Sequence, residues 1–68
     1  MSNQGKKSRV LRIQEVTQRT GLSRSLIYVL MKQGTFPQSI KLSQRAVGWF
    51  EDELLGWFDR RVAERAGP

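Results

Sequence analysis

Apolar positions three residues apart predict a short helix over residues 13–20. Ile13 and Val16 would lie on one face of this helix, and polar residues occupy most of the remaining positions. Gly21 follows directly, and glycine commonly ends a helix because it adopts the left-handed backbone conformation without a Cβ clash. The pattern therefore predicts that this helix ends at Thr20.

A second helix is predicted from Arg24 to about Gln33. Ser23 precedes it and is a favoured N-cap residue, while Gly34 follows it and would end it. The apolar positions of this segment form a helical stripe made of Leu26, Ile27, Leu30 and Met31. Two short helices joined through residues 20–23 have the outline of a helix-turn-helix, and the alternative interpretation is an ordinary helical hairpin.

Beyond Gly34 the pattern changes from helical to alternating. Pro37 disfavours helix at Phe36, because the residue before a proline is restricted to extended conformations. Residues 40–42 alternate apolar and polar as a half-buried strand does, and residues 46–50 return as a second strand. The polar residues between them predict a β-hairpin. A short strand, or an extended lead into the first helix, is expected at residues 10–12.

A third helix is predicted to begin at Glu51. Three consecutive acidic residues suit a helix N-terminus, where the helix dipole favours negative charge. The apolar residues that follow have helical spacing, namely Leu54, Leu55, Trp57, Phe58 and Val62. We expect Trp49 and Trp57 to lie in the core and to pack this helix onto the hairpin. Gly56 is expected to permit that close packing.

Together these elements predict a mainly α-helical fold with a small β-hairpin wing, a winged helix-turn-helix. The 68 residues of the chain allow one domain at most, with a small core. We expect the folded domain to span residues 10–66. Residues 1–9 are polar and basic, and they are expected to form a flexible arm because they carry too little apolar surface to order themselves.

The composition narrows the chemistry that the chain can perform. It contains neither cysteine nor histidine, which excludes disulfides, thiolate nucleophiles, imidazole bases and the common zinc sites. We expect the acidic residues after Phe50 to form a solvated helix face. From the sequence we therefore expect that the chain is not an enzyme. We also expect no catalytic or metal-binding residue, no cofactor and no small-molecule ligand.

The hydropathy of the chain predicts no membrane partner. No apolar run approaches the roughly 20 residues needed to cross a bilayer. Residues 1–12 are basic and lack the apolar core of a signal peptide. We therefore expect a cytoplasmic protein associated with the nucleoid.

Charge is distributed unevenly along the chain. Twelve Lys or Arg and six Asp or Glu give a net charge of +6. Residues 1–50 hold nine basic residues and one acid, a net of +8, whereas residues 51–68 hold three basic and five acidic residues, a net of −2. No acid occurs from Thr17 to Phe50. A compact chain with this asymmetry presents a positive face to a polyanion such as DNA, RNA or an anionic membrane.

The polar face of the second helix is the predicted reading surface. The first residues of a recognition helix enter the major groove, so Arg24 and Ser25 would reach base edges there, and Arg24 can bind a guanine bidentately. Tyr28 would contact a phosphate or a thymine methyl, and Lys32 would contact the DNA backbone. The predicted contacts from this helix are Ser23, Arg24, Ser25, Tyr28 and Lys32. The alternative is a solvated helix face.

The hairpin tip and the basic arm supply further predicted contacts. A wing of this kind rests on phosphates or inserts an arginine into the minor groove, and Arg45 is the residue expected to do so. The predicted wing contacts are Lys41, Ser43, Gln44 and Arg45, and the arm would add Lys6, Lys7 and Arg9. The alternative interpretation of the tip is a solvated turn.

Residues 11–60 resemble the AlpA family of prophage regulatory proteins. The resemblance is carried by Gln14-Glu15-Val16, Arg19-Thr20-Gly21-Leu22-Ser23-Arg24-Ser25, Ile27-Tyr28, Leu30, Lys32-Gln33-Gly34, Phe36-Pro37, Lys41-Leu42, Arg45-Ala46-Val47-Gly48-Trp49 and Trp57. It implies a MerR-like or excisionase-like winged helix-turn-helix that binds double-stranded DNA. It also implies a regulator of promoters on prophages and integrative elements, or an excisionase that directs an integrase toward excision.

Three positions depart from the family pattern. The family often has a small polar residue at the position of Leu26, a basic residue at Val29 and a glycine at Ser43. Val29 therefore weakens the expectation of a cationic grip at mid-helix. Leu26 and Val29 leave extra apolar surface, and we take burial against a neighbouring protomer as a hypothesis for it.

Two other classes of function stay open from the sequence. The apolar helix faces would also suit a protein-interaction module such as an antirepressor. Trp49, Phe50, Trp57 and Phe58 would also suit a stacking platform for RNA or single-stranded DNA, although core packing is the expected role of these residues.

Overall fold

The computed structural model describes residues 9–66, so Lys6, Lys7 and most of the predicted arm lie outside the described residues. The elements of the described part are β1 (Val10–Leu11), α1 (Ile13–Thr20), α2 (Arg24–Gln33), β2 (Ile40–Ser43), β3 (Ala46–Phe50) and α3 (Glu51–Ala66). The expected winged helix-turn-helix is confirmed, with α1 and α2 as the helical pair and β2–β3 as the wing.

Glycine and serine set the ends of α1 and α2 as the sequence predicts. Gly21 and Gly34 have φ angles of 74° and 80°, in the left-handed region that favours glycine. The backbone N–H of Leu26 donates a hydrogen bond of 3.1 Å to Ser23 Oγ, so Ser23 caps α2. These local signals fix the end of α1 and both ends of α2.

The three strands form an antiparallel sheet in the order β1-β3-β2. Leu11 pairs with Trp49 in the central strand β3, and Lys41 of β2 pairs with Val47. The ladder between β2 and β3 is irregular between Lys41 and Ser43. Ser43 belongs to β2, so the turn at the hairpin tip is one residue shorter than the predicted polar tip.

The core collects one or two side chains from almost every segment. The buried apolar residues of the described part are Leu11, Val16, Ile27, Phe36, Trp49, Leu54 and Trp57. Phe36 was expected only to stop a helix, yet it is 4% exposed. Leu26 is 41% exposed, so its assignment to the apolar stripe of α2 is wrong. The stripe consists of Ile27, Leu30 and Met31.

Both tryptophans hold the connection between α2 and β2. Trp49 Nε1 donates a hydrogen bond of 3.0 Å to the carbonyl oxygen of Pro37. Trp57 Nε1 donates one of 2.8 Å to the carbonyl oxygen of Thr35. The Trp57 ring also packs edge to face on Phe36, with 4.9 Å between the centroids. The predicted core role of both indoles is confirmed, but Trp57 packs α3 onto this connection.

Close packing occurs at Gly48 and not at the predicted Gly56. A Cβ on Gly48 would collide with Val10 Cγ1 and lie 3.0 Å from the carbonyl oxygen of Leu11. A Cβ on Gly56 would meet only Arg60 Nη1, at 3.9 Å. The expectation for Gly56 is therefore wrong, because the strand glycine in the middle of the sheet makes the close approach.

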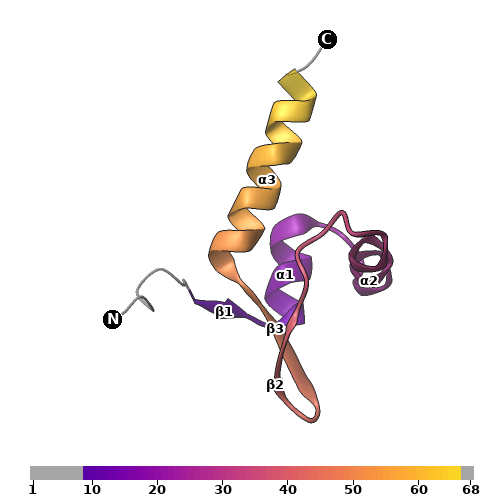
Figure 1. Cartoon of the computed structure of the whole chain (residues 1–68), viewed down its shortest axis with the longest axis vertical. Helices are drawn as coiled ribbons and strands as arrows, with labels where there is room; N and C mark the ends of the chain where they lie inside the picture. Colours follow the sequence, from indigo (N-terminus) through magenta and orange to yellow (C-terminus); the bar gives the residue numbers. More distant parts are fainter. Residues whose placement is uncertain (1–8, 67–68) are drawn as a thin grey trace.

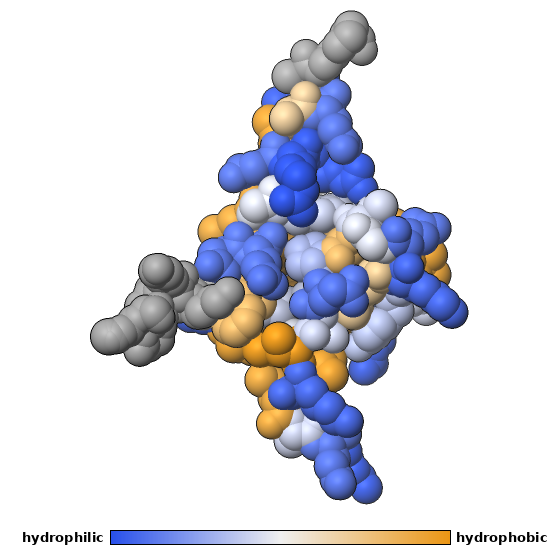
Figure 2. Space-filling view, in the orientation of Figure 1, coloured by the Kyte–Doolittle hydropathy of each residue, from blue (hydrophilic) through white to orange (hydrophobic). Residues whose placement is uncertain are grey.

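The projecting parts of the fold point in different directions (Figure 1). The β2–β3 hairpin extends from one end of the molecule, and α3 extends from the opposite end. Helix α2 lies to one side of the body, between these two projections. The hairpin tip is hydrophilic, whereas hydrophobic surface gathers at its base (Figure 2).

Candidate nucleic-acid interface

The outward face of α2 carries the predicted reading residues. Ile27 is fully buried, so residues placed about half a turn from it point away from the core. The four predicted contacts within α2 are all exposed, namely Arg24, Ser25, Tyr28 and Lys32. This exposure agrees with a contact surface.

Tyr28 lies on the flank of α2 that faces the hairpin. Its ring is 40% exposed and meets Trp49 of β3 edge to face, with 6.3 Å between the centroids and 60° between the planes. The buried indole therefore supports the tyrosine from behind. Arg24 is one turn earlier on the helix and shares this flank. The two side chains border the space between α2 and the wing.

Ser23 caps α2 and is also a predicted DNA contact. Its hydroxyl oxygen accepts the hydrogen bond from the Leu26 N–H that caps α2. Loss of this oxygen would free a backbone donor at the helix start. A substitution of Ser23 therefore changes the helix end together with any contact to DNA.

The wing presents its polar side chains at an exposed tip. Lys41, Gln44 and Arg45 are exposed. Ser43 Oγ accepts a hydrogen bond of 3.4 Å from the backbone N–H of Arg45. Ser43 thus supports the turn between β2 and β3, which carries Arg45.

The ion pairs described for residues 9–66 lie on the side of the molecule built from β1, α1 and α3. The salt bridges within residues 9–66 join Glu15 to Arg9 and Arg19, Glu51 to Arg19, and Glu64 to Arg61. None of them involves a side chain of α2 or of the wing, where no acid occurs. Four cations on those two elements therefore have no carboxylate partner among residues 9–66: Arg24, Lys32, Lys41 and Arg45.

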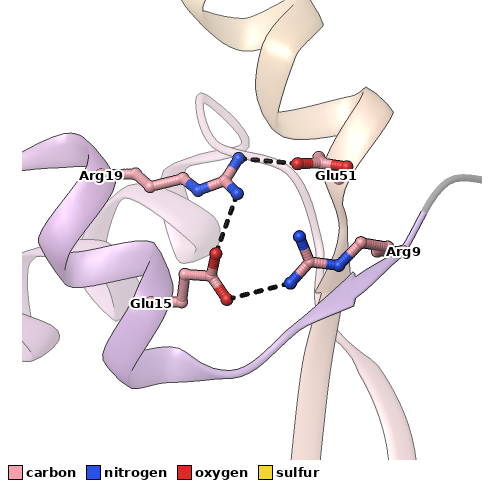
Figure 3. Close-up of polar contacts among 4 residues, drawn as sticks. All are labelled: Arg9, Glu15, Arg19 and Glu51. Carbon is pink, nitrogen blue, oxygen red and sulfur yellow. Dashed lines mark hydrogen bonds and ion pairs between the residues drawn. The ribbon is translucent and has the colours of Figure 1, made fainter.

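Arg19 is the centre of the largest polar cluster of the described chain (Figure 3). Its Nη1 and Nη2 atoms donate hydrogen bonds of 2.8 Å to Glu51 Oε2 and Glu15 Oε2, respectively. The bond to Glu51, followed by the bond to Glu15, raises the pKa of the Arg19 guanidinium above its ordinary value. Arg19 is therefore always charged, and its charge is already matched by two carboxylates.

Arg9 joins the same cluster. Its Nη2 lies 3.4 Å from Glu15 Oε1, and its carbonyl oxygen accepts a hydrogen bond of 2.8 Å from the Glu51 N–H. The sequence placed Arg9 in the basic arm. In the structure it is the one member of the predicted arm that is described, and it is tied to α1 and α3.

Sequence reasoning overlooked Arg19, although part of its environment is visible in the chain. Glu15 and Arg19 are four residues apart in a helix, a spacing that places opposite charges together. Glu51 is 32 residues further along. No local pattern indicates that partner, because it depends on how α3 is placed against α1.

Leu26 and Val29 are exposed apolar side chains on α2, at 41% and 48%. Hydrophobic surface over α2 is bordered by hydrophilic surface (Figure 2). The two surface depressions beside Phe36 and Pro37 are lined by residues of the connection between α2 and β2, of β2, of β3 and of α3. None of the predicted contact residues lines them.

Metal sites and membrane-spanning helices are both absent from the part of the chain that the structure describes. No group of three or more acidic, histidine or cysteine side chains in residues 9–66 is placed to hold a metal ion. None of the helices of the described chain has the length and hydropathy needed to cross a membrane.

The chain is similar to a known protein family and to individual known proteins. The family model described as "Prophage CP4-57 regulatory protein (AlpA)" matches residues 9–62. The uncharacterized protein ORF88 of Enterobacteria phage P4 is 42% identical over 57 residues, which cover 84% of this chain and 65% of the phage protein. The DNA-binding transcriptional activator AlpA of Escherichia coli (strain K12) is 36% identical over 59 residues, covering 78% of this chain and 84% of that protein. The chain thus spans just under two thirds of the length of the phage relative.

Proposed function

The chain belongs to the AlpA family of prophage regulatory proteins, and we propose that it is a transcriptional regulator that binds double-stranded DNA sequence-specifically. The observation that carries this proposal is the set of cations on α2 and the wing. Arg24, Lys32, Lys41 and Arg45 are exposed and take part in no ion pair among residues 9–66. A surface whose charged groups are all positive attracts a polyanion and repels basic partners.

Helix α2 is the element we assign to the major groove. That groove admits an α-helix, and its base edges differ for all four base pairs. Arg24 would bind guanine O6 and N7, Ser25 would contact an adjacent base edge, and Tyr28 would contact a phosphate or a base from the flank facing the wing. Lys32 would meet the backbone. These roles account for both affinity and sequence preference.

The wing would contact the DNA beside the major groove. Arg45 at the tip is placed to bind phosphates or to enter a narrow minor groove, and Lys41 and Gln44 would add backbone contacts. Helix α3 extends from the opposite end of the molecule, and it carries most of the acidic residues (Figure 1). We therefore assign α3 to the side turned away from DNA.

Binding assays that compare nucleic acids test this function. Fluorescence anisotropy would be measured with duplex DNA, single-stranded DNA and RNA of one sequence over a series of salt concentrations. We expect a preference for duplex and an affinity that falls steeply with salt, because bound cations displace counterions from the DNA. Absence of duplex binding at low salt would overturn the proposal, and a preference for RNA or single strands would favour the alternative binding module.

A matched pair of variants separates the proposed surface from net charge. The double variant Arg24→Ala with Arg45→Ala removes two charges from α2 and the wing. The double variant Arg60→Ala with Arg65→Ala removes two charges from α3. We expect the first pair to lose most duplex affinity and the second pair to retain it, although their net charges are equal. Equal losses would show that the interface is misplaced.

An excisionase role would use the same DNA interface, with an integrase and neighbouring protomers as further partners. Footprinting on the DNA that surrounds the gene distinguishes the roles. Protected sites over a promoter support transcriptional control, whereas several adjacent sites within an attachment region support excision. A DNA-free complex with a repressor protein would instead support the antirepressor alternative.

A further inference from the structure

We propose that Val29 recognises the 5-methyl group of a thymine in the major groove, and that it thereby helps to set the sequence preference of α2. The inference rests on the proposed function, since it requires duplex DNA against α2. It adds one apolar contact, with the thymine methyl group, to the polar contacts that we propose for α2.

Val29 lies in the middle of the outward face of α2. Ser25 is four residues before it and Lys32 three residues after it, so all three side chains share one face of the helix. Ile27 is fully buried, and Ser25 and Val29 stand two residues to either side of it. At 3.6 residues per turn, both point about 160° away from Ile27. Two of its helical neighbours, Ser25 and Lys32, are therefore residues assigned to DNA.

The chemistry of valine selects one group of the major groove. Valine offers two methyl groups and no hydrogen-bonding atom, so it gains nothing from base nitrogens or oxygens. The thymine C5-methyl is the apolar group that the four bases present in that groove. The side chain is 48% exposed, so apolar surface is available for burial on binding. Its β-branch also holds χ1 nearly fixed within a helix, which lowers the entropy lost in the contact.

The charges around Val29 favour DNA over a second copy of the chain as its occupant. Lys32 stands on the same face, and no acidic residue lies anywhere on α2. Two copies that met through this face would bring like charges together. A DNA duplex instead supplies phosphates for the cations and a methyl group for the valine. We therefore favour DNA over a neighbouring protomer as the occupant at this residue.

Leu26 differs from Val29 in its position on the helix. It is 41% exposed, but it lies between Val29 and the half-buried Leu30, at the border of the core stripe. It is therefore displaced from the line formed by Ser25, Val29 and Lys32. Leu26 supplies a matched control, an apolar side chain of similar exposure on the same helix.

The test removes the methyl group from the DNA. After the preferred duplex has been found by selection from a random library, each thymine in turn is replaced by deoxyuridine, which lacks only the 5-methyl. Affinity is measured by fluorescence anisotropy for the parent, Val29→Ala, Val29→Thr and Leu26→Ala. Melting curves establish that each variant is folded.

We expect one or two thymines at which the parent loses affinity about threefold to fivefold on replacement, the size expected for one buried methyl group. Val29→Ala should bind the thymine duplex more weakly and show no further loss with deoxyuridine. Val29→Thr, which keeps one methyl, and Leu26→Ala should both retain the response. Comparing the effect of deoxyuridine on the parent with its effect on Val29→Ala gives the coupling between the two changes. This coupling separates the contact between Val29 and the methyl group from any effect of the methyl group on DNA shape.

Three results would overturn the inference. One is a parent that responds to deoxyuridine at no thymine, and another is a Val29→Ala variant with the full response. The third is a change in self-association of Val29→Ala in sedimentation without a change in thymine dependence, which would assign the residue to a second copy. The proposed function survives all three, because duplex binding persists in each. A parent that binds no duplex overturns both.

Discussion

Arg19 and Glu51 are joined by a hydrogen bond of 2.8 Å from Nη1 to Oε2, across 32 residues of sequence. Glu51 is the first residue of α3 and directly follows β3, the central strand and one arm of the wing. Arg19 lies in the last turn of α1, beside the turn that leads to α2. The pair therefore connects the helix-turn-helix to the base of the wing.

Replacing Arg19 should loosen that connection. We expect Arg19→Ala to lower the melting temperature and to weaken duplex binding by a similar factor for preferred and scrambled sequences. The reason is that Glu15 and Glu51 would be left without their shared cation while the reading residues stay unchanged. Thermal denaturation and anisotropy measure the two effects. Glu64→Gln, which breaks the exposed Arg61 pair far along α3, is the control and should change neither.

Replacing two residues on the wing-facing flank of α2 should remove sequence preference. A good side-chain contact to a base is worth about 1–3 kcal/mol of discrimination. We expect the double variant Arg24→Ala with Tyr28→Ala to bind preferred and scrambled duplexes alike. Lys32→Ala, a predicted backbone contact on the same helix, should weaken binding to both and keep the preference. A double variant that still discriminates would move the reading contacts elsewhere.

Replacing Arg45 should affect DNA binding without altering sequence preference. Loss of one phosphate contact reduces the slope of log affinity against log salt by about 1. We expect Arg45→Ala to show this reduction and to weaken binding evenly across sequences. The measurement is a salt titration of duplex affinity, with Arg65→Ala as a control that removes an equal charge from α3. An unchanged slope for Arg45→Ala would argue for a solvated turn.

Two glycine substitutions should shift stability in opposite directions. Gly48→Ala places a methyl group against Val10 and Leu11, and we expect overpacking to cost about 1–3 kcal/mol. Gly56→Ala places a methyl group in nearly open space within α3, and helix propensity should then stabilise the fold by about 1 kcal/mol. Urea denaturation of both variants checks the signs. A stabilising Gly48→Ala would contradict the close approach.

The features that could be predicted from the sequence depend on neighbouring residues. Gly21 and Ser23 signal a helix end and a helix start within three positions, and the alternation in residues 40–50 signals the hairpin. These signals predict the boundaries of the elements. The absence of acidic residues from Thr17 to Phe50 predicts the positively charged face. Such patterns are decided by backbone conformation and local charge, which distant parts of the chain alter little.

The features that were missed depend on packing between distant segments. Phe36 lies in a connection, where no periodicity marks it as buried, and Trp57 comes to it from 21 positions away in α3. Gly48 and Gly56 look alike in a sequence, yet only Gly48 has a neighbouring strand against it. Leu26 has helical spacing for the core, but α1 and the sheet do not extend far enough round α2 to cover it.

The indole hydrogen bond from Trp49 to the carbonyl oxygen of Pro37 bears on which molecule would change shape in the proposed complex with DNA. The Trp49 N–H lies in a tightly packed site, so swinging the wing relative to α2 would break its bond to Pro37 and leave the donor without a partner. The spacing between the recognition helix and the wing tip is thus a fixed dimension of the protein. A duplex whose grooves do not match that dimension must bend or twist to fit it. Flexible base steps between the two contacts, which the protein does not touch, would then contribute to the choice of site.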